Sequence, residues 1–277
     1  MDSSLSLSLA TFIYALASIF YIGSFSFKKN ILAKIGFIVL ITGFLFNTGG
    51  IILRWIESYQ VGYGHAPFAN MYESLVFFSW TVAILYIFVE LKYKESIIGV
   101  FASPLVFLAI AYASLSPDIS DKITPLIPAL KSNWLIAHVI TCFLGYAGFA
   151  VAFGFSIMYF VKPQNPETKS IFAKLPSWDL MDELTYQMVV FGFLFLTIGI
   201  ITGAVWANSA WGKYWSWDPK ETWSLITWFV YAIFMHLRMM KGWQGRKLAL
   251  VSIIGFIAVM FTYFGVNYLL SGLHSYG

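Results

Sequence analysis

The sequence predicts an all-α, polytopic integral membrane protein, a bundle of about eight transmembrane helices. Of the 277 residues, 59% are hydrophobic and only 11% are charged, whereas a soluble domain carries about a quarter charged residues. Apolar runs of about 20 residues, the length that a helix needs to cross the hydrocarbon core, recur along the chain. None of these runs alternates apolar and polar residues, so we expect helices rather than the strands of a barrel.

The apolar runs define the spans in order. The first run lacks the basic region of a cleavable signal peptide, so we expect it to remain in the membrane. The predicted spans are 8–27, 32–53, 73–91, 97–114, 134–160, 184–207, 221–240 and 248–270. Residues 161–183 are expected to include a short surface helix that leads into the sixth span. No repeat or low-complexity tract separates the spans, so residues 1–277 are predicted to form a single domain.

Basic residues predict the orientation of the bundle. The short 28–34 connection holds three lysines, and when it is placed inside, most of the 17 lysines and arginines fall on that side. Both termini are then outside, together with the loops 54–72 and 115–133 and the connection between spans six and seven. The net charge of +4 therefore reflects membrane topology and gives no reason to expect a nucleic-acid partner.

One outer stretch, WANSAWGKYWSWDPKETWSLITW at residues 206–228, is rich in indole and yet polar. Amphipathic rings settle at the membrane–water boundary, but an ordinary aromatic belt explains one or two of them rather than this density. We therefore expect a platform for a large planar ligand. Its expected residues are Trp206, Trp211, Tyr214, Trp215, Trp217 and Trp223, with Lys213 and Lys220 able to face an anionic group such as a propionate.

Two carboxylates within this stretch, Asp218 and Glu221, invite a catalytic interpretation. The structural interpretation is better, because Asp218 is a good N-cap, Pro219 suits the first helical position and Glu221 can close a capping box. We predict that this arrangement begins the seventh span and fixes how the chain leaves the tryptophan-rich stretch.

Histidines are the candidate metal ligands, at His65, His138, His236 and His274. A lone histidine on an apolar helix often only bonds a neighbouring helix, yet ionisable groups inside membranes are costly and lean towards function. His138, about 6 Å into span five, and His274, just past span eight, share the outer side with the tryptophan-rich stretch. His236 lies roughly 22 Å deeper along span seven and cannot share an iron with them. Two imidazoles approaching one iron from opposite faces would make a six-coordinate haem site.

The single cysteine and the glycines have simpler interpretations. Because Cys142 stands alone and no CxxCH motif is present, the chain has no disulfide and no covalent haem of its own. Cys142 follows His138 by one helical turn and is expected to be a buried, inert thiol. Close packing of spans five and six is the expected role of Gly145, Gly148, Gly154, Gly192, Gly199 and Gly203.

The run WGKYWSWDPKETW resembles the tryptophan-rich, WWD-type signature of the haem-handling cytochrome c assembly proteins, and here that segment covers 206–223. Its lead-in LPSWDLMDELTYQMVVFGFLFLTIGIITGAVWAN, its continuation SLITWFVYAIFMHLR and the motif GHAPFANMYES are similar to the CcsA/ResC-type subunit in particular. The match is close over residues 64–74 and 175–240, and the layout of eight spans fits the whole chain.

The resemblance implies specific roles for these residues. His138 and His274 would ligate a non-covalent haem b on the outer side, beside Asp218 and the indoles of the signature. His236 would ligate haem in transit, with the second ligand supplied by a large CcsB/ResB-type partner subunit. His65 receives no role from the motif. The chemistry implied is addition of the two thiols of an apocytochrome c CxxCH peptide across the haem vinyl groups, in which the protein positions its substrates.

Alternative functions stay open from the sequence. One is a haem transporter or chaperone that passes haem to a separate ligase, and another is a transporter for a different aromatic or quinone-like ligand. The enzymatic interpretation is the haem-binding subunit of a cytochrome c haem lyase. We expect a multi-pass protein surrounded by membrane lipids, in the bacterial cytoplasmic membrane or in a thylakoid membrane.

Overall fold

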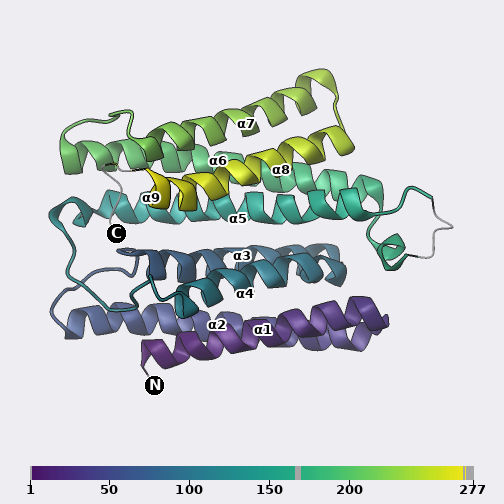
Figure 1. The fold of residues 1–277 in the computed structure, drawn as a ribbon, viewed down its shortest axis with the longest axis horizontal. Coiled ribbons are helices and arrows are strands. Elements are labelled where there is room, and N and C mark those ends of the chain that lie inside the picture. The colour runs from purple at the N-terminus through teal and green to yellow at the C-terminus, as the bar shows by residue number, and fades with distance from the viewer. Residues whose placement is uncertain (1, 166–169, 271, 273–277) are drawn as a thin grey trace. The chain divides into compact units, whose positions relative to one another are not determined.

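In the computed structural model, which describes residues 2–165, 170–270 and 272, every regular element is a helix. The long ones are α1 (Ser3–Phe27), α2 (Asn30–Gln60), α3 (Met71–Tyr93), α4 (Gly99–Leu115), α5 (Asn133–Val161), α6 (Trp178–Trp211), α7 (Pro219–Lys241) and α8 (Arg246–Met260) (Figure 1). The short ones are η1 (Ser96–Ile98), η2 (Pro128–Leu130), η3 (Ile171–Lys174), η4 (Phe261–Gly265) and α9 (Val266–Leu269). Within the described residues, 8 helical segments are long and apolar enough to cross a membrane, which confirms the predicted number and a multi-pass membrane protein.

Helix packing divides the chain into two compact units, Met1–Ile127 and Pro128–Gly277. The first unit contains α1 to α4, with α1 packed against α2 and α4, and α3 packed against α2 and α4. The second contains α5 to α9, with α5 packed against α6 and α8, and α7 packed against α6 and α8.

The first unit is held by a close antiparallel contact between α1 and α2. Large residues spaced by seven on α1 pack on glycines spaced by seven on α2. The contacting pairs are Leu7 with Gly50, Tyr14 with Gly43, and Tyr21 with Gly36. A Cβ atom built on Gly43 would lie 2.8 Å from Cδ1 of Tyr14, so only glycine admits the ring there. Large residues of one helix thus fill the gaps that small residues leave on the other, as in other membrane helix pairs.

The second unit is held mainly by α5 and α6, as the glycine pattern predicted. A Cβ built on Gly148 would lie 2.9 Å from the carbonyl oxygen of Met188, and one on Gly145 would lie 3.0 Å from the backbone nitrogen of Leu196. The two backbones therefore approach closely, and the predicted packing role of these glycines is confirmed.

Two helices extend beyond their predicted bounds. α6 begins at Trp178 rather than at residue 184, because the Ser177 side chain accepts a hydrogen bond from the backbone nitrogen of Leu180 (3.3 Å) and caps the helix. The last residues of the predicted surface segment 161–183 therefore belong to α6, and the short helix expected in that segment is η3. α2 continues to Gln60 because two of its charged residues find partners. Arg54 pairs with Glu73 (Nε–Oε1, 2.7 Å), and Glu57 accepts from the backbone nitrogen of Ser3 (2.7 Å).

Candidate functional site

The tryptophan-rich stretch leads into α7 through the predicted capping box. The Asp218 side chain accepts from the backbone nitrogen of Lys220 (3.0 Å), Pro219 takes the first helical position, and the Glu221 side chain accepts from the backbone nitrogen of Asp218 (3.2 Å). Both carboxylates are buried. They satisfy backbone donors at the start of the helix, which confirms their structural interpretation.

Glu221 also shapes the loop that precedes the helix. It accepts from the backbone nitrogen of Ser216 (2.8 Å), which draws residues 216–218 into a tight turn. Within that turn Trp217 has φ +58°, a left-handed conformation that is uncommon for a residue with a bulky side chain and is typical of functional sites. The Trp217 side chain is 69% exposed and meets Trp215 edge to face, with centroids 5.8 Å apart. The turn therefore presents one indole outward and braces it with another.

Two other tryptophans of the signature lie at the end of α6. Trp206 is buried, and its Nε1 donates to the carbonyl oxygen of Ala129 (2.9 Å). Trp211 packs edge-on against Trp206, with centroids 5.0 Å apart. Trp206 therefore serves as an internal anchor for this end of the unit and is not part of an open surface.

Next to this anchor lies His138 of α5. Its imidazole stacks on Trp206, with centroids 5.7 Å apart and planes 19° apart. Its Nδ1 donates to the carbonyl oxygen of Gly199 on α6 (2.8 Å). Since a carbonyl only accepts, the neutral ring carries its proton on Nδ1 and its lone pair on Nε2. A backbone carbonyl that fixes the tautomer in this way is typical of metal-binding histidines.

The GxxxG motif of α6, Gly199 and Gly203, has a second role that sequence reasoning missed. A Cβ built on Gly203 would lie 2.6 Å from Nδ1 of His138 and 2.7 Å from its Cε1, so the absence of a side chain makes room for the imidazole. Gly199 supplies the carbonyl that orients it. The sequence predicts helix packing alone for this motif, because only the alignment of α5 with α6 reveals which residue faces it. Cys142 is buried, as predicted, with its Sγ 3.6 Å from Nδ1 of His138.

The start of α7 is tied to the last part of the chain. Nζ of Lys220 donates to Oδ1 of Asn267 in α9 (3.0 Å), and the Trp223 ring packs on Phe261 with centroids 4.1 Å apart. Phe261 begins η4, a π-helical turn of the kind that often occurs at functional sites. His274 itself lies outside the described residues. Lys213 and Tyr214 are exposed in the loop between α6 and α7.

The remaining histidines lie elsewhere. His65, in the first unit, is buried, and its ring nitrogens lie 2.9 Å from the carbonyl oxygens of Ala66 (Nδ1) and Thr124 (Nε2). His236 is exposed on α7, roughly 22 Å along the helix from Glu221, and makes no hydrogen bond, ion pair or ring contact with another described residue. The second unit thus brings His138 together with Trp206 and Trp211, and it ties Lys220 and Trp223 to the last part of the chain. It places His236 towards the opposite end of α7.

Comparison with known proteins identifies the family. The sequence profile described as "Cytochrome C assembly protein" matches residues 68–274. The chain belongs to this family. Its similarity to curated proteins named cytochrome c biogenesis protein CcsA makes it a CcsA-type member. The protein from Chlorella vulgaris is 40% identical over 82% of this chain and 81% of its own length. The protein from a Synechococcus strain is 41% identical over 84% of this chain and 83% of its own length. The protein from Prochlorococcus marinus is 38% identical over 100% of this chain and 95% of its own length.

A solved structure shares the fold of this CcsA-type chain. The protein titled "Cytochrome c Heme Lyase CcmF" superposes with a TM-score of 0.73 over 98% of the chain, at 16% sequence identity. The chain spans about half of that longer protein (48%). At this identity the similarity establishes the common helical fold, and it confirms the predicted all-α membrane architecture.

Proposed function

We propose that this CcsA-type cytochrome c assembly protein binds haem b at the outer end of its second unit and presents it for covalent attachment to apocytochrome c. The observation that carries the proposal is the His138 imidazole, which is stacked on Trp206 and held by the Gly199 carbonyl with the lone pair on Nε2. These contacts fix the ring plane and the tautomer before any ligand arrives, as a haem-iron ligand requires.

Haem is the substrate of this site, and the surrounding residues fit its parts. His274, which follows the helix that Lys220 and Trp223 contact, is the proposed second axial ligand. The indoles of Trp211, Trp215 and Trp217 offer apolar faces and edges to the macrocycle, and the exposed Lys213 offers a cation to a propionate. Asp218 contributes by fixing the turn that carries these rings.

The covalent step needs no group that leaves. Each thiol of the CxxCH peptide adds across one vinyl group, so that sulfur bonds to the carbon next to the ring and the thiol proton ends on the terminal carbon. No net oxidation or reduction occurs. The chain acts by holding the vinyl edge towards the peptide, which converts the addition into a reaction between positioned partners. The peptide's own histidine then replaces one axial imidazole and allows release.

Haem supply from the other side of the membrane is the proposed role of His236. An exposed imidazole on a membrane-spanning helix is costly unless it meets a ligand or another protein, so we propose that haem passes there. A large CcsB/ResB-type subunit would supply the second ligand. In this arrangement both units serve as one haem-handling domain, with both chain termini outside, in a bacterial cytoplasmic or thylakoid membrane.

A spectrum of the complex tests the outer site. The chain is purified with its membrane partner, and haem content and the reduced spectrum are compared between wild type and the double variant His138→Ala/His274→Ala. We expect the variant to lose the outer haem and most cytochrome c maturation. Full haem content with unimpaired maturation in the variant would refute the proposal.

His236→Ala separates transit from final binding. We expect it to lower haem occupancy at the outer site by limiting supply, and we expect added imidazole to restore part of it. Unchanged occupancy would assign His236 to a contact with a neighbouring protein.

The exposed position of His236 also favours the alternative function, a haem transporter that passes its cargo to a separate ligase. An assay of thioether formation with the purified complex, haem, reductant and a CxxCH peptide distinguishes the two. Product formation without further proteins supports the lyase, whereas haem transfer without thioether formation supports the transporter.

A further inference from the structure

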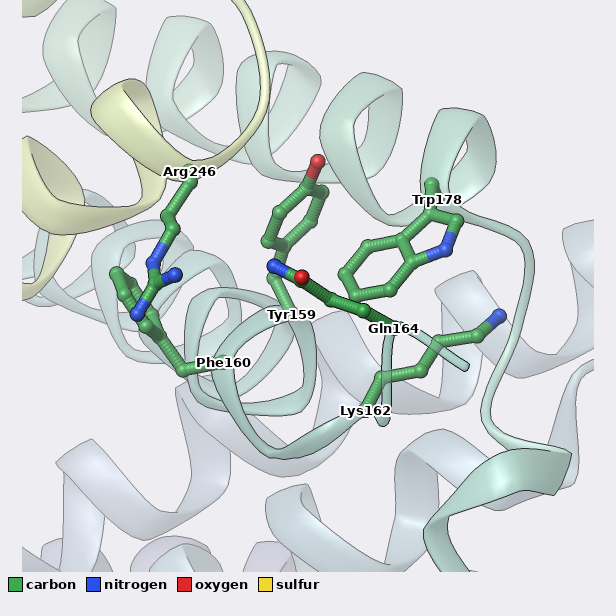
Figure 2. Close-up of a pocket in the computed structure, with 6 residues that line it drawn as sticks. All are labelled: Tyr159, Phe160, Lys162, Gln164, Trp178 and Arg246. Carbon is green, nitrogen blue, oxygen red and sulfur yellow. The ribbon is translucent and has the colours of Figure 1, made fainter. Parts of the chain in front are cut away.

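At the end of the second unit away from the tryptophan-rich loop, a cavity of about 320 Å³ lies where α5 ends and where α6 and α8 begin. Its size is at the lower end for small-molecule sites. Figure 2 shows the side chains that line it: Tyr159, Phe160, Lys162, Gln164, Trp178 and Arg246. The lining therefore combines aromatic rings, an amide and two cations, at the side that the basic residues predict to be inner.

Lys162 builds one wall of the cavity. Its Nζ donates to the carbonyl oxygens of Leu175 (3.0 Å) and Pro176 (2.5 Å) and lies 5.2 Å from the centre of the Trp178 ring. Partial burial lowers the pKa of this ammonium group. Two of its three N–H donors thus bind the segment that leads into α6. Lys162 therefore shapes the cavity and makes its electrostatic potential more positive, and it is not the main direct contact for a ligand.

Arg246 is the cation that remains available. It is the first residue of α8, it is exposed, and its guanidinium packs over the Phe160 ring at 5.2 Å. In Figure 2 the guanidinium lies on the far side of the cavity from the Lys162 ammonium group. Arg246 forms no ion pair with an acid in the described part of the chain. Asp182, a carboxylate near Tyr159, is already bound by Arg238 (2.5 Å) and by the backbone nitrogen of Gly245 (2.6 Å).

An apolar stripe continues from Arg246 along α8. Leu250, Ile254 and Ile257 follow at intervals of three or four residues, so they share the helix face of Arg246, and they are 51%, 49% and 60% exposed. A charge at the helix end with an apolar row beyond it matches a molecule that has an anionic head and a hydrocarbon tail.

We propose that this cavity binds the headgroup phosphate of an anionic phospholipid, with Arg246 holding the phosphate and the acyl chains lying along Leu250, Ile254 and Ile257. Basic pockets between helix ends on the cytoplasmic side are typical sites for such headgroups. Arginine suits this role because its planar fork can bind two phosphate oxygens at once. The apolar stripe favours a lipid over a free phosphate ion. This site would be separate from the haem site and does not depend on it.

The test compares two neighbouring cations on one helix. Arg246→Gln removes the proposed phosphate ligand, and Lys247→Gln removes another exposed charge, whose ammonium group lies instead over the Trp243 ring (5.0 Å). Native mass spectrometry of the full chain counts bound phosphatidylglycerol, with phosphatidylcholine and inorganic phosphate as separate arms. A lone charge near an anionic surface contributes about fivefold in affinity, so Lys247→Gln sets the size of the unspecific effect.

We expect wild type to retain phosphatidylglycerol over phosphatidylcholine, and Arg246→Gln to weaken retention on the order of tenfold more than Lys247→Gln does. Arg246→Lys keeps the charge but not the fork and should fall between wild type and Arg246→Gln. Equal losses in the two glutamine variants, or equal retention of the two lipids, would overturn the proposal. Inorganic phosphate that displaces the lipid at millimolar concentration would show that the cavity recognises the phosphate ion without its tails, and this would also count against it.

Discussion

His65 in the first unit and His138 in the second were both candidate ligands, and their surroundings differ in one decisive respect. His138 has its Nδ1 on a backbone carbonyl, which leaves the lone pair of the neutral ring on Nε2. His65 has a carbonyl oxygen 2.9 Å from each ring nitrogen. Both ring nitrogens of His65 are therefore occupied by groups of the protein itself. His138 is thus oriented by a carbonyl of the neighbouring helix, whereas His65 joins two loops of the protein.

Charged groups in the two units also differ in their partners. In the first unit two buried charged side chains bind each other: Arg54 pairs with Glu73 and also packs over the Tyr72 ring at 5.0 Å. In the second unit, Asp218 and Glu221 accept from backbone nitrogens, and Glu221 also accepts from the Ser216 hydroxyl, so that they hold a loop that presents the Trp217 indole outward. The comparison teaches that the Arg54–Glu73 pair joins helices of the first unit to each other, whereas the carboxylates at the start of α7 hold a loop that presents an indole.

The largest expected effect comes from removing the His138 ring. His138→Gly should lower haem occupancy and cytochrome c maturation at least tenfold, because the oriented nitrogen is lost, and added imidazole should restore a large part of both. Haem is measured by the reduced spectrum of the purified complex, and maturation by covalent haem staining of a reporter cytochrome c.

The matched control is His65→Gly under the same conditions. Imidazole should have no effect on its haem content, since His65 lies in the first unit and the proposed haem site lies in the second. If both glycine variants respond alike to imidazole, the distinction between the two histidines fails.

Sequence reasoning recovered what depends on local pattern. Apolar runs predicted the helices, and the residues from Asp218 to Glu221 predicted the start of α7, because a capping box is set by neighbours in the chain. It could not recover contacts that depend on which helices face each other. Two contacts appear only when the helices are paired. One is the packing of Tyr14 of α1 on Gly43 of α2, within the rows of residues spaced by seven, and the other is the space that Gly203 leaves for His138. The strained backbone of Trp217 is equally invisible in the sequence.

A smaller, more specific effect is expected from Gly203→Ala. The added methyl group would lie 2.6 Å from Nδ1 of His138, so the ring must turn away from the Gly199 carbonyl. We expect haem affinity to fall several-fold and the haem absorption bands to shift. Gly145→Ala is the control, because its methyl group would press on the backbone of Leu196 (3.0 Å from N) at the same α5–α6 contact without touching His138. Gly145→Ala should lower thermal stability and leave the haem spectrum unchanged. Equal spectral shifts in both variants would contradict the role of Gly203 in making room for the His138 ring.

The smallest effect on haem is expected from His65→Ala, which should leave the haem spectrum and its affinity at wild-type values. The effect should fall on stability, because the carbonyls of Ala66 and Thr124 lose their shared donor in a buried setting. Leaving a buried acceptor without a partner costs about 1–3 kcal/mol, which lowers the thermal midpoint by several degrees. His65→Gln can still donate to one of the two carbonyls and should lose roughly half as much. A thermal midpoint equal to wild type in His65→Ala, or a haem spectrum that changes with it, would remove the contrast between a histidine that joins loops and one that is held ready for a ligand.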